Sequence, residues 1–195
     1  MLAVIVCLLS VNSITQAQPD DGTDGSIDAA CGSSDRARQL ARLIINDAGQ
    51  HRPQLRCNAT LTAVAEQKVR DMAEHGQVSH IGPGGANARL RAAGYPLPAH
   101  YPSLGANQVE AVAGGYGDPH ELWRQFKASS AHRLHLLGEH PFYRRQNEIG
   151  VAYYRRPESP HEFYWAVYVA EQGEPSRIAS HPAAGGVPDK STYGD

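Results

Sequence analysis

The sequence lacks the features that would assign it to several protein classes. Its longest apolar run, LAVIVCLL at residues 2–9, is too short to span a bilayer, so we predict no membrane span. Lysine and arginine total 18 against 20 aspartates and glutamates, and no basic stripe occurs, which argues against a nucleic-acid binder that neutralises phosphates. The chain has no Gly-Xaa-Ser-Xaa-Gly elbow, no HEXXH motif and no phosphate-binding glycine loop. No single motif in the sequence therefore identifies a reaction.

The apolar run at residues 2–9 has the length of the hydrophobic part of a signal peptide. Thr-Gln-Ala, ending at Ala17, supplies a small-residue cleavage pattern, although no lysine or arginine precedes the run. The alternative is a buried N-terminal strand, but residues 19–28 have the composition of a linker. We predict a signal peptide at 1–17, an acidic linker at 18–30, and a protein that is secreted or periplasmic.

Cysteine is scarce, with three residues in the whole chain. Cys7 would leave with the signal peptide, so Cys31 and Cys57 form the one pair available to the mature protein. Thiols in an oxidising compartment usually couple, and we predict this disulfide; two unpaired structural cysteines are the alternative. A lipid anchor on Cys31 is not predicted, because the residues before it lack the leucine of a lipid-attachment box.

Hydrophobic spacing predicts helices through the first two thirds of the chain and two strands near its end. Ser34 precedes apolar residues that repeat at three and four positions, as a helix N-cap does. Residues 148–154 and 163–170 are β-branched and aromatic, which predicts a β-hairpin. This order predicts an α+β fold at 31–172, with helices covering a small antiparallel sheet, and a disordered tail at 173–195. The predicted helices run from Ser34 to Gly49, from Asn58 to His75, over 86–93, from Asp118, and over 131–137, with an irregular connection at 96–117.

The chain has ten histidines, and two of them, with one glutamate, stand out as candidates for chemistry. His80 lies directly before the turn Gly82-Pro83-Gly84-Gly85, where a side chain can point into a cleft from a rigid backbone. His132 begins a short helix and stands three residues before His135, although such a pair alone is a weak metal signal. Glu110 lies among apolar neighbours and is either exposed or a buried, paired carboxylate. A structural histidine with satisfied hydrogen bonds is the alternative for both imidazoles.

The order of several short motifs resembles that of the CAP superfamily, the SCP-domain proteins that include cysteine-rich secretory proteins, antigen 5 and plant pathogenesis-related proteins, and is most similar to the bacterial branch. The resemblance covers residues 36–171. Glu110, five residues before Gly115, matches the family's Gly-Glu-Asn-Ile-Ala segment with Ala111 in place of asparagine; a rival register uses Gly105-Ala106-Asn107 and loses the glutamate. The other matching motifs are Val78-Ser79-His80 before the glycine turn, Ala88-Arg89-Leu90, Ala93-Gly94-Tyr95, Ser129-Ser130-Ala131-His132-Arg133, Ile149-Gly150-Val151-Ala152 and Tyr164-Trp165, with Phe126 in the place of a usual tryptophan.

The resemblance implies a three-layer α-β-α sandwich whose central cleft binds a divalent metal, often zinc, in some members. His80 and His132 take the family's histidine positions and Glu110 takes one glutamate position. These three residues are the expected cleft, and the two histidines are the expected metal ligands. The second glutamate of eukaryotic members has no counterpart in this sequence. The implied cofactor is therefore Zn2+ or another divalent cation at an open site, with Glu110 orienting an imidazole or a bound water.

Two functions follow from these residues. The one we favour is a non-catalytic, exported binding module whose cleft takes a metal ion, a small ligand, a lipid or a peptide; lipid binding recurs among eukaryotic members, and no reaction is general to the family. The alternative is a metal-assisted hydrolase in which Glu110 accepts a proton from water, but it needs a third metal ligand that the sequence does not supply. A third hypothesis is that the three side chains only tie the helices together through buried hydrogen bonds.

Overall fold

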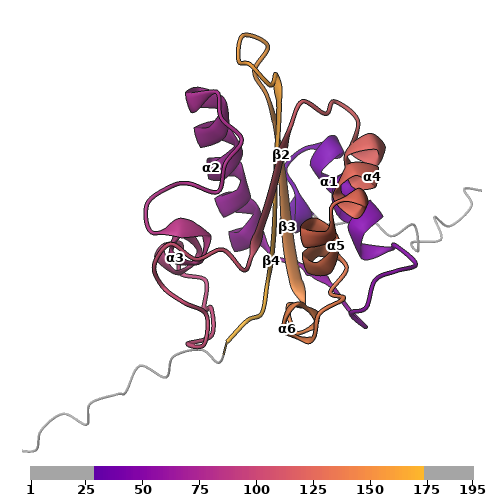
Figure 1. Cartoon of the computed structure of the whole chain (residues 1–195), viewed down its shortest axis with the longest axis vertical. Helices are drawn as coiled ribbons and strands as arrows, with labels where there is room; N and C mark the ends of the chain where they lie inside the picture. Colours follow the sequence, from indigo (N-terminus) through magenta and orange to yellow (C-terminus); the bar gives the residue numbers. More distant parts are fainter. Residues whose placement is uncertain (1–28, 174–195) are drawn as a thin grey trace, which may run out of the picture.

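A four-stranded sheet lies between two layers of helices in the computed structural model, which describes residues 29–173. Helices α2 and α3 lie on one side of the sheet, and α1, α4 and α5 lie on the other (Figure 1). This arrangement confirms the predicted α+β class and its three layers. The elements are η1 (Ala29–Cys31), α1 (Asp35–Ile45), β1 (Arg56–Cys57), α2 (Ala59–His75), α3 (Gly85–Ala92), β2 (Glu110–Gly114), α4 (Pro119–Ala128), α5 (Ser130–Leu136), α6 (Pro141–Arg144), β3 (Glu148–Arg155) and β4 (Phe163–Ala170).

Some sequence predictions fall outside the described residues. The signal peptide at 1–17, most of the linker at 18–30 and nearly all of the tail at 173–195 belong to this group. Among the helices of residues 29–173, none combines the length and the apolar character needed to cross a bilayer.

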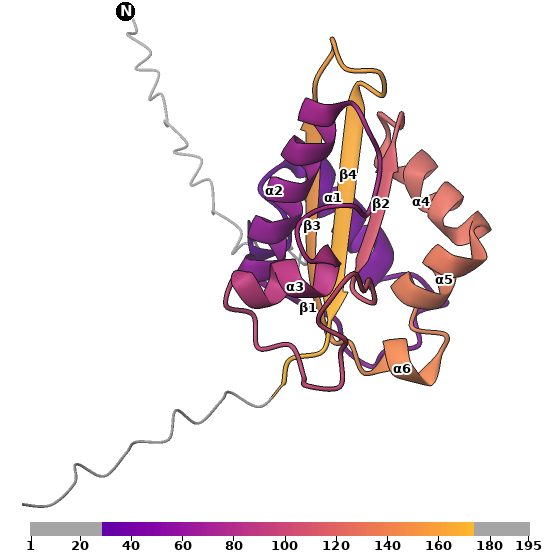
Figure 2. The ribbon, with the colours of Figure 1, turned by 60° about the vertical axis from the view of Figure 1, so that its left-hand side comes forward.

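The strands follow the order β1-β3-β4-β2, which places β2 at one border of the sheet (Figure 2). The predicted hairpin is confirmed as β3 paired antiparallel with β4, with Gly150 opposite Tyr168. The prediction of an antiparallel sheet was wrong in one respect, because the two-residue strand β1 runs parallel to β3. Parallel neighbours need a long crossover, and the chain between β1 and β3 supplies one in α2 through α6.

Strand β4 is buried on both faces, and its alternation divides the core in two. Tyr164, Ala166 and Tyr168 pack with α2 and α3, whereas Trp165 and Val167 pack with α1 and α4 on the opposite face. Successive side chains of a strand point to opposite faces, so one apolar run serves both helical layers. This explains why the segment carries a continuous apolar pattern instead of an alternating one.

Most helix boundaries agree with the capping residues in the sequence. Ser34 caps α1, and the Asn58 side chain accepts hydrogen bonds from the amides of Thr60 and Leu61 at the start of α2. Gly76 ends α2 in the left-handed conformation, at φ 66°. The predicted stop of α1 at Gly49 was wrong, because the helix ends at Ile45 and is capped by Asn46.

The prediction of an irregular connection over 96–117 was also wrong, because strand β2 forms within it at Glu110–Gly114. Its sequence, Glu-Ala-Val-Ala-Gly, contains one β-branched residue and has little strand propensity of its own. Pairing with β4 along the whole strand stabilises it instead, with Val112 opposite Ala166. A long-range pairing of this kind leaves no local sequence signal.

Gly150 lets α2 pack close to the sheet. A Cβ atom at this position of β3 would overlap the backbone of Leu61 and Thr62 in the first turn of α2. We expect Gly150→Ala to lower the free energy of unfolding by about 2–3 kcal/mol, since the obstructing atoms are backbone and cannot change rotamer. Urea unfolding measures the loss. Gly49→Ala is the control, because its Cβ would meet only side-chain atoms, the nearest being Asp47 Oδ1 at 3.2 Å, and it should change stability by less than about 1 kcal/mol. Equal losses in the two variants would contradict the packing argument.

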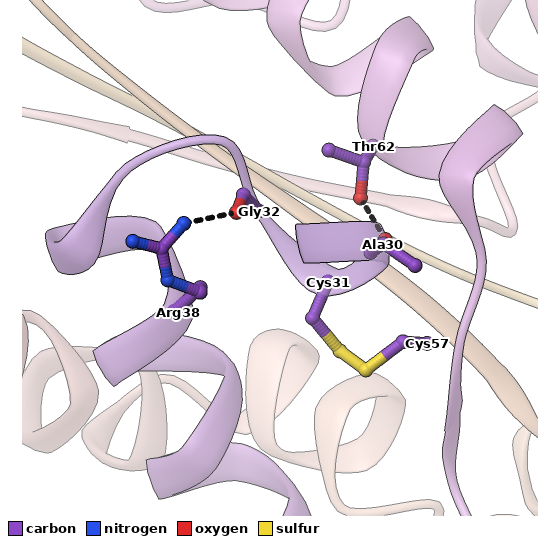
Figure 3. Close-up of a disulfide and its surroundings, with 6 residues drawn as sticks. All are labelled: Ala30, Cys31, Gly32, Arg38, Cys57 and Thr62. Carbon is purple, nitrogen blue, oxygen red and sulfur yellow. Dashed lines mark hydrogen bonds between the residues drawn. A yellow bond between two sulfur atoms is a disulfide. The ribbon is translucent and has the colours of Figure 1, made fainter. Parts of the chain in front are cut away.

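The predicted disulfide is present and joins η1 to β1. Figure 3 shows Cys31 linked to Cys57, with the Arg38 guanidinium donating to the Gly32 carbonyl nearby. The hydroxyl of Thr62, in α2, donates to the Ala30 carbonyl. The bridge thus fixes the start of the described chain against the edge of the sheet.

Candidate functional site

The three sequence candidates meet at one cavity of about 140 Å³. The cavity lies where the loop after α2, the start of β2 and helix α5 come together, so each candidate arrives from a different part of the chain. The residues that line it are His80, Asn107, Gln108, Glu110, Ala131, His132, His135 and Tyr143.

His80 is held by the carboxylate of Glu110. Its Nδ1 lies 2.8 Å from Glu110 Oε1 and 2.9 Å from the Asn107 amide nitrogen. An ionised carboxylate only accepts hydrogen bonds, so Nδ1 carries the proton and donates it to Glu110. That tautomer leaves a lone pair on Nε2, which has no hydrogen-bond partner among residues 29–173. The His80 side chain is 47% exposed, so this lone pair is available to a ligand.

Glu110 is buried and paired, which is one of the two states that its sequence context allowed. Its side chain is fully buried, and Oε2 accepts a 2.6 Å hydrogen bond from Arg89 Nη2 and another from the hydroxyl of Tyr168. Burial alone would raise the pKa of the Glu110 carboxyl, but the His80 hydrogen bond, the Arg89 charge and the Tyr168 hydrogen bond outweigh it and lower that pKa. Both oxygens of the ionised Glu110 carboxylate thus already accept hydrogen bonds from the protein's own side chains.

Arg89, Tyr168 and Lys68 make further hydrogen bonds that support this arrangement. Arg89 Nε donates to the Tyr168 hydroxyl at 3.1 Å, and burial raises the pKa of Tyr168, so its proton remains available to Glu110. Lys68, in α2, is 2% exposed and donates from Nζ to the Ile81 carbonyl at 2.8 Å. This bond ties the loop that carries His80 to the buried face of α2.

Asn107, which belongs to the segment used by the rival register, hydrogen-bonds to the backbone of Glu110. Its amide nitrogen donates to the Glu110 carbonyl at 3.0 Å, and its Oδ1 accepts from the Glu110 amide at 2.9 Å. Glu110 itself supplies the carboxylate beside His80. The segment of the rival register thus fixes the backbone of Glu110 without replacing its side chain.

His132 faces the same cavity from α5. Its Nδ1 lies 3.0 Å from Ser129 Oγ, and its ring packs against Phe126 at a centroid distance of 4.8 Å. Burial, and next the neighbouring His80, lower the pKa of His132. A hydroxyl can accept from Nδ1, in which case Nε2 carries a lone pair. The imidazole is therefore neutral near pH 7, as metal coordination requires.

His135, one helical turn after His132, is a structural residue at the floor of the cavity. Burial, and next the charge of Arg52, lower its pKa to about 3. Its Nε2 lies 3.5 Å from the Val169 carbonyl. The spacing of three residues from His132 therefore does not supply a second exposed imidazole.

Two imidazoles are the nitrogen ligands that this cavity could offer to an open metal site, and they are too few for a closed one. His80 and His132 present imidazoles to one cavity, and Glu110 orients the first of them, as carboxylates do behind metal-bound histidines. Among residues 29–173, no cluster of three or more histidine, cysteine, aspartate or glutamate side chains is placed to hold a metal ion. A cation here would take water or another ligand to complete its coordination.

A larger cavity elsewhere is lined by polar groups that already bond to one another. It has a volume of about 570 Å³, lies between α1 and α4 and includes Asp47, Trp123 and Lys127. Both Trp123 Nε1 and Lys127 Nζ donate to Asp47 Oδ2 at 2.8 Å, so these three polar groups satisfy one another. Of these two cavities, the smaller one at Glu110 is the one that brings His80 and His132 together beside a buried carboxylate.

Sequence reasoning missed Tyr168 and Lys68 and noted Arg89 only as part of a motif. The one available signal was that a glutamate buried among apolar residues requires a cation or several donors. That requirement does not say which arginine, lysine or tyrosine meets it. All three partners lie at least 21 residues from Glu110 in the chain, and only the fold identifies them.

Comparisons with known proteins add one structural likeness. No protein-family model and no curated protein sequence matches this chain. Among solved structures, an outer surface protein from Borrelia burgdorferi is similar, with a TM-score of 0.47 and 15% sequence identity over 69% of this chain and 88% of that protein. A likeness of this degree carries no argument about function.

Proposed function

We propose that this protein is an exported binding module of the CAP type, whose cavity at His80 and His132 takes a divalent metal ion together with a small ligand. The Cys31–Cys57 disulfide supports an oxidising destination, secreted or periplasmic, because such bonds persist outside reducing compartments. The order of motifs that resembles the CAP superfamily and the three-layer architecture support the family assignment.

The observation that carries the proposal is the hydrogen bond between Glu110 and His80. It holds Nδ1 protonated and leaves the Nε2 lone pair free to bind a metal ion, and the neutral imidazole of His132 lines the same cavity. A bound cation would polarise a coordinated water or anion. The chain's own residues contribute two nitrogen ligands, a fixed tautomer and an Arg89 charge that keeps Glu110 ionised.

The hydrolase alternative draws no support from this geometry. It assigns proton transfer to Glu110, whose two oxygens already accept from His80, Arg89 and Tyr168 and whose pKa is lowered. A general base near neutral pH needs a raised pKa and a free oxygen. Glu110 is better suited to orient His80 than to move a proton.

Titration with ZnCl2 by isothermal calorimetry tests the proposal. We expect one site per chain, and we expect His80→Ala and His132→Ala each to weaken zinc binding by at least about tenfold, because each removes one of two protein ligands. His120→Ala is the matched control: this exposed histidine of α4 contacts Gln39 and lies outside the cavity, so its variant should bind zinc like the parent.

Two results would overturn the metal assignment. One is that the parent protein binds no zinc above the level of a variant lacking both cavity histidines. The other is that His120→Ala weakens binding as much as His80→Ala does, which would mean that scattered surface histidines account for it.

A further inference from the structure

The hydrogen-bond phase of the β2–β4 ladder determines which backbone groups of β2 face away from the sheet. Val169 N donates to Val109 O at 2.9 Å, and Gly115 N donates to Phe163 O at 3.0 Å. In an antiparallel pair, hydrogen-bonded residues alternate with residues whose amide and carbonyl point the other way. The odd-numbered residues of β2 therefore bond β4, and Glu110, Val112 and Gly114 direct their N–H and C=O groups to the outer edge.

An amide group already occupies the first of these three positions. The Asn107 side chain accepts from Glu110 N and donates to Glu110 O, as a residue of a neighbouring strand would. Within residues 29–173, no hydrogen bond reaches the outward N–H and C=O of Val112 and Gly114. The open part of the edge therefore begins after Glu110 and consists of the outward N–H and C=O groups of Val112 and Gly114.

Residues 111–114 carry no charged side chain, no proline and no bulge that would protect the open part of the edge against strand pairing. Natural edges are guarded by lysine, proline, an inward charge or a bulge. Residues 111–114 are Ala-Val-Ala-Gly, and the pairing with β4 is regular through all of them. On one face of the strand the side chains of Val78 and His161 lie close to Gly114, so a second strand would approach in the plane of the sheet.

The edge also leads to the cavity. Glu110, the first residue of β2, lines the cavity with His80 and His132, and β2 is the last strand on its side of the sheet (Figure 2). An extended chain paired with Val112 and Gly114 would continue past the two imidazoles at the Glu110 end of the strand.

We propose that the outer edge of β2 binds an extended peptide by strand addition, through the N–H and C=O groups of Val112 and Gly114, next to the His80–His132 cavity. Main-chain hydrogen bonds supply affinity in this mode, and pockets for side chains supply specificity. The proposal names a partner class for the binding role above, but it depends on the edge and not on the metal. It therefore stands or falls separately from zinc binding.

The test screens an array of capped, randomised peptides of about seven residues against the protein in EDTA. The tightest peptide is then added to 15N-labelled protein, and amide hydrogen exchange is followed by NMR. In the free protein, the Ala111 and Ala113 amides should exchange slowly and those of Val112 and Gly114 rapidly; the peptide should slow Val112 and Gly114 by at least about tenfold. His80→Ala should retain this protection, which separates the proposal from the metal site.

N-methylation of the peptide and a paired substitution identify the contact as backbone pairing. Successive amides of an extended peptide point alternately toward β2 and away from it. Methylating the nitrogens that face β2 should weaken binding by about tenfold, whereas methylating those that face away should hardly change it. Val112→Pro removes an N–H that the β4 ladder does not use, so it should abolish the protection of the Gly114 amide, whereas Val112→Ala keeps that N–H and should retain the protection of Gly114.

Four outcomes would overturn the proposal. These are an array without any peptide that binds below about 1 mM, a bound peptide that leaves Val112 and Gly114 exchange unchanged, equal effects of the two methylation phases, and protection that grows with protein concentration in the absence of peptide. The last would assign the edge to a second copy of this chain.

Discussion

Glu110→Gln should lower the free energy of unfolding by about 3–5 kcal/mol, the cost of leaving a buried charge without its partner. Glutamine keeps the shape of the side chain but removes the negative charge that Arg89 and His80 face. Arg89 is 17% exposed and cannot regain its hydration without opening the structure. Urea unfolding at neutral pH measures the loss.

Two further variants separate the buried pair from charge in general. Glu139→Gln removes the carboxylate that pairs with the more exposed Arg133, and it should cost less than about 1 kcal/mol. Arg89→Met combined with Glu110→Gln should recover part of the loss, because neither partner then remains buried and charged. A Glu110→Gln loss no larger than that of Glu139→Gln would contradict the buried network.

The same carboxylate makes stability depend on pH in a defined direction. The pKa of Glu110 is lower in the folded protein than in the unfolded chain, so its contribution is fully present above the unfolded pKa, about 4.3. The contribution is lost as the pH falls through the lower, folded pKa. Glu110→Gln should therefore flatten the pH dependence of unfolding below about pH 4.3, and an unchanged slope would contradict the lowered pKa.

The parts of the fold that the sequence predicted are those with local causes. Ser34, Asn58 and Asp118 cap helices by hydrogen bonds to amides two or three residues away, and such signals are complete within one turn. Strands β2 and β1 were not predicted, because their partners lie far along the chain: Val112 is opposite Ala166, and Cys57 is opposite Ile149. The Ala- and Gly-containing segment Glu110–Gly114 forms a strand because its backbone hydrogen-bonds to β4.

The candidate site divides in the same way. Residue types and motif order indicated His80, Glu110 and His132, since each is unusual in its local setting. The sequence around Arg89 and Tyr168 contains no comparable signal, because arginine is common in short helices and tyrosine is common in buried strands. Their role follows from α3 packing over β4, which brings both to one carboxylate oxygen.

Removing the Cys31–Cys57 disulfide should lower the free energy of unfolding by about 3.5 kcal/mol, the chain-entropy value for cysteines 26 residues apart. The closed loop contains α1 and the approach to β1, so the bridge restricts the unfolded chain across a whole helix of one layer. The double variant Cys31→Ala, Cys57→Ala compared with the oxidised parent by urea unfolding measures the effect.

The reduced parent distinguishes the cross-link from the packing of the cysteine side chains. Cys31 is fully buried, so a change to alanine also removes contacts, whereas reduction of the parent breaks only the bridge. If the cross-link dominates, the reduced parent should lose nearly as much stability as the double variant. Free thiols that react with an alkylating agent in the native, unreduced protein would contradict the bridge itself, and equal stability before and after reduction would contradict its contribution.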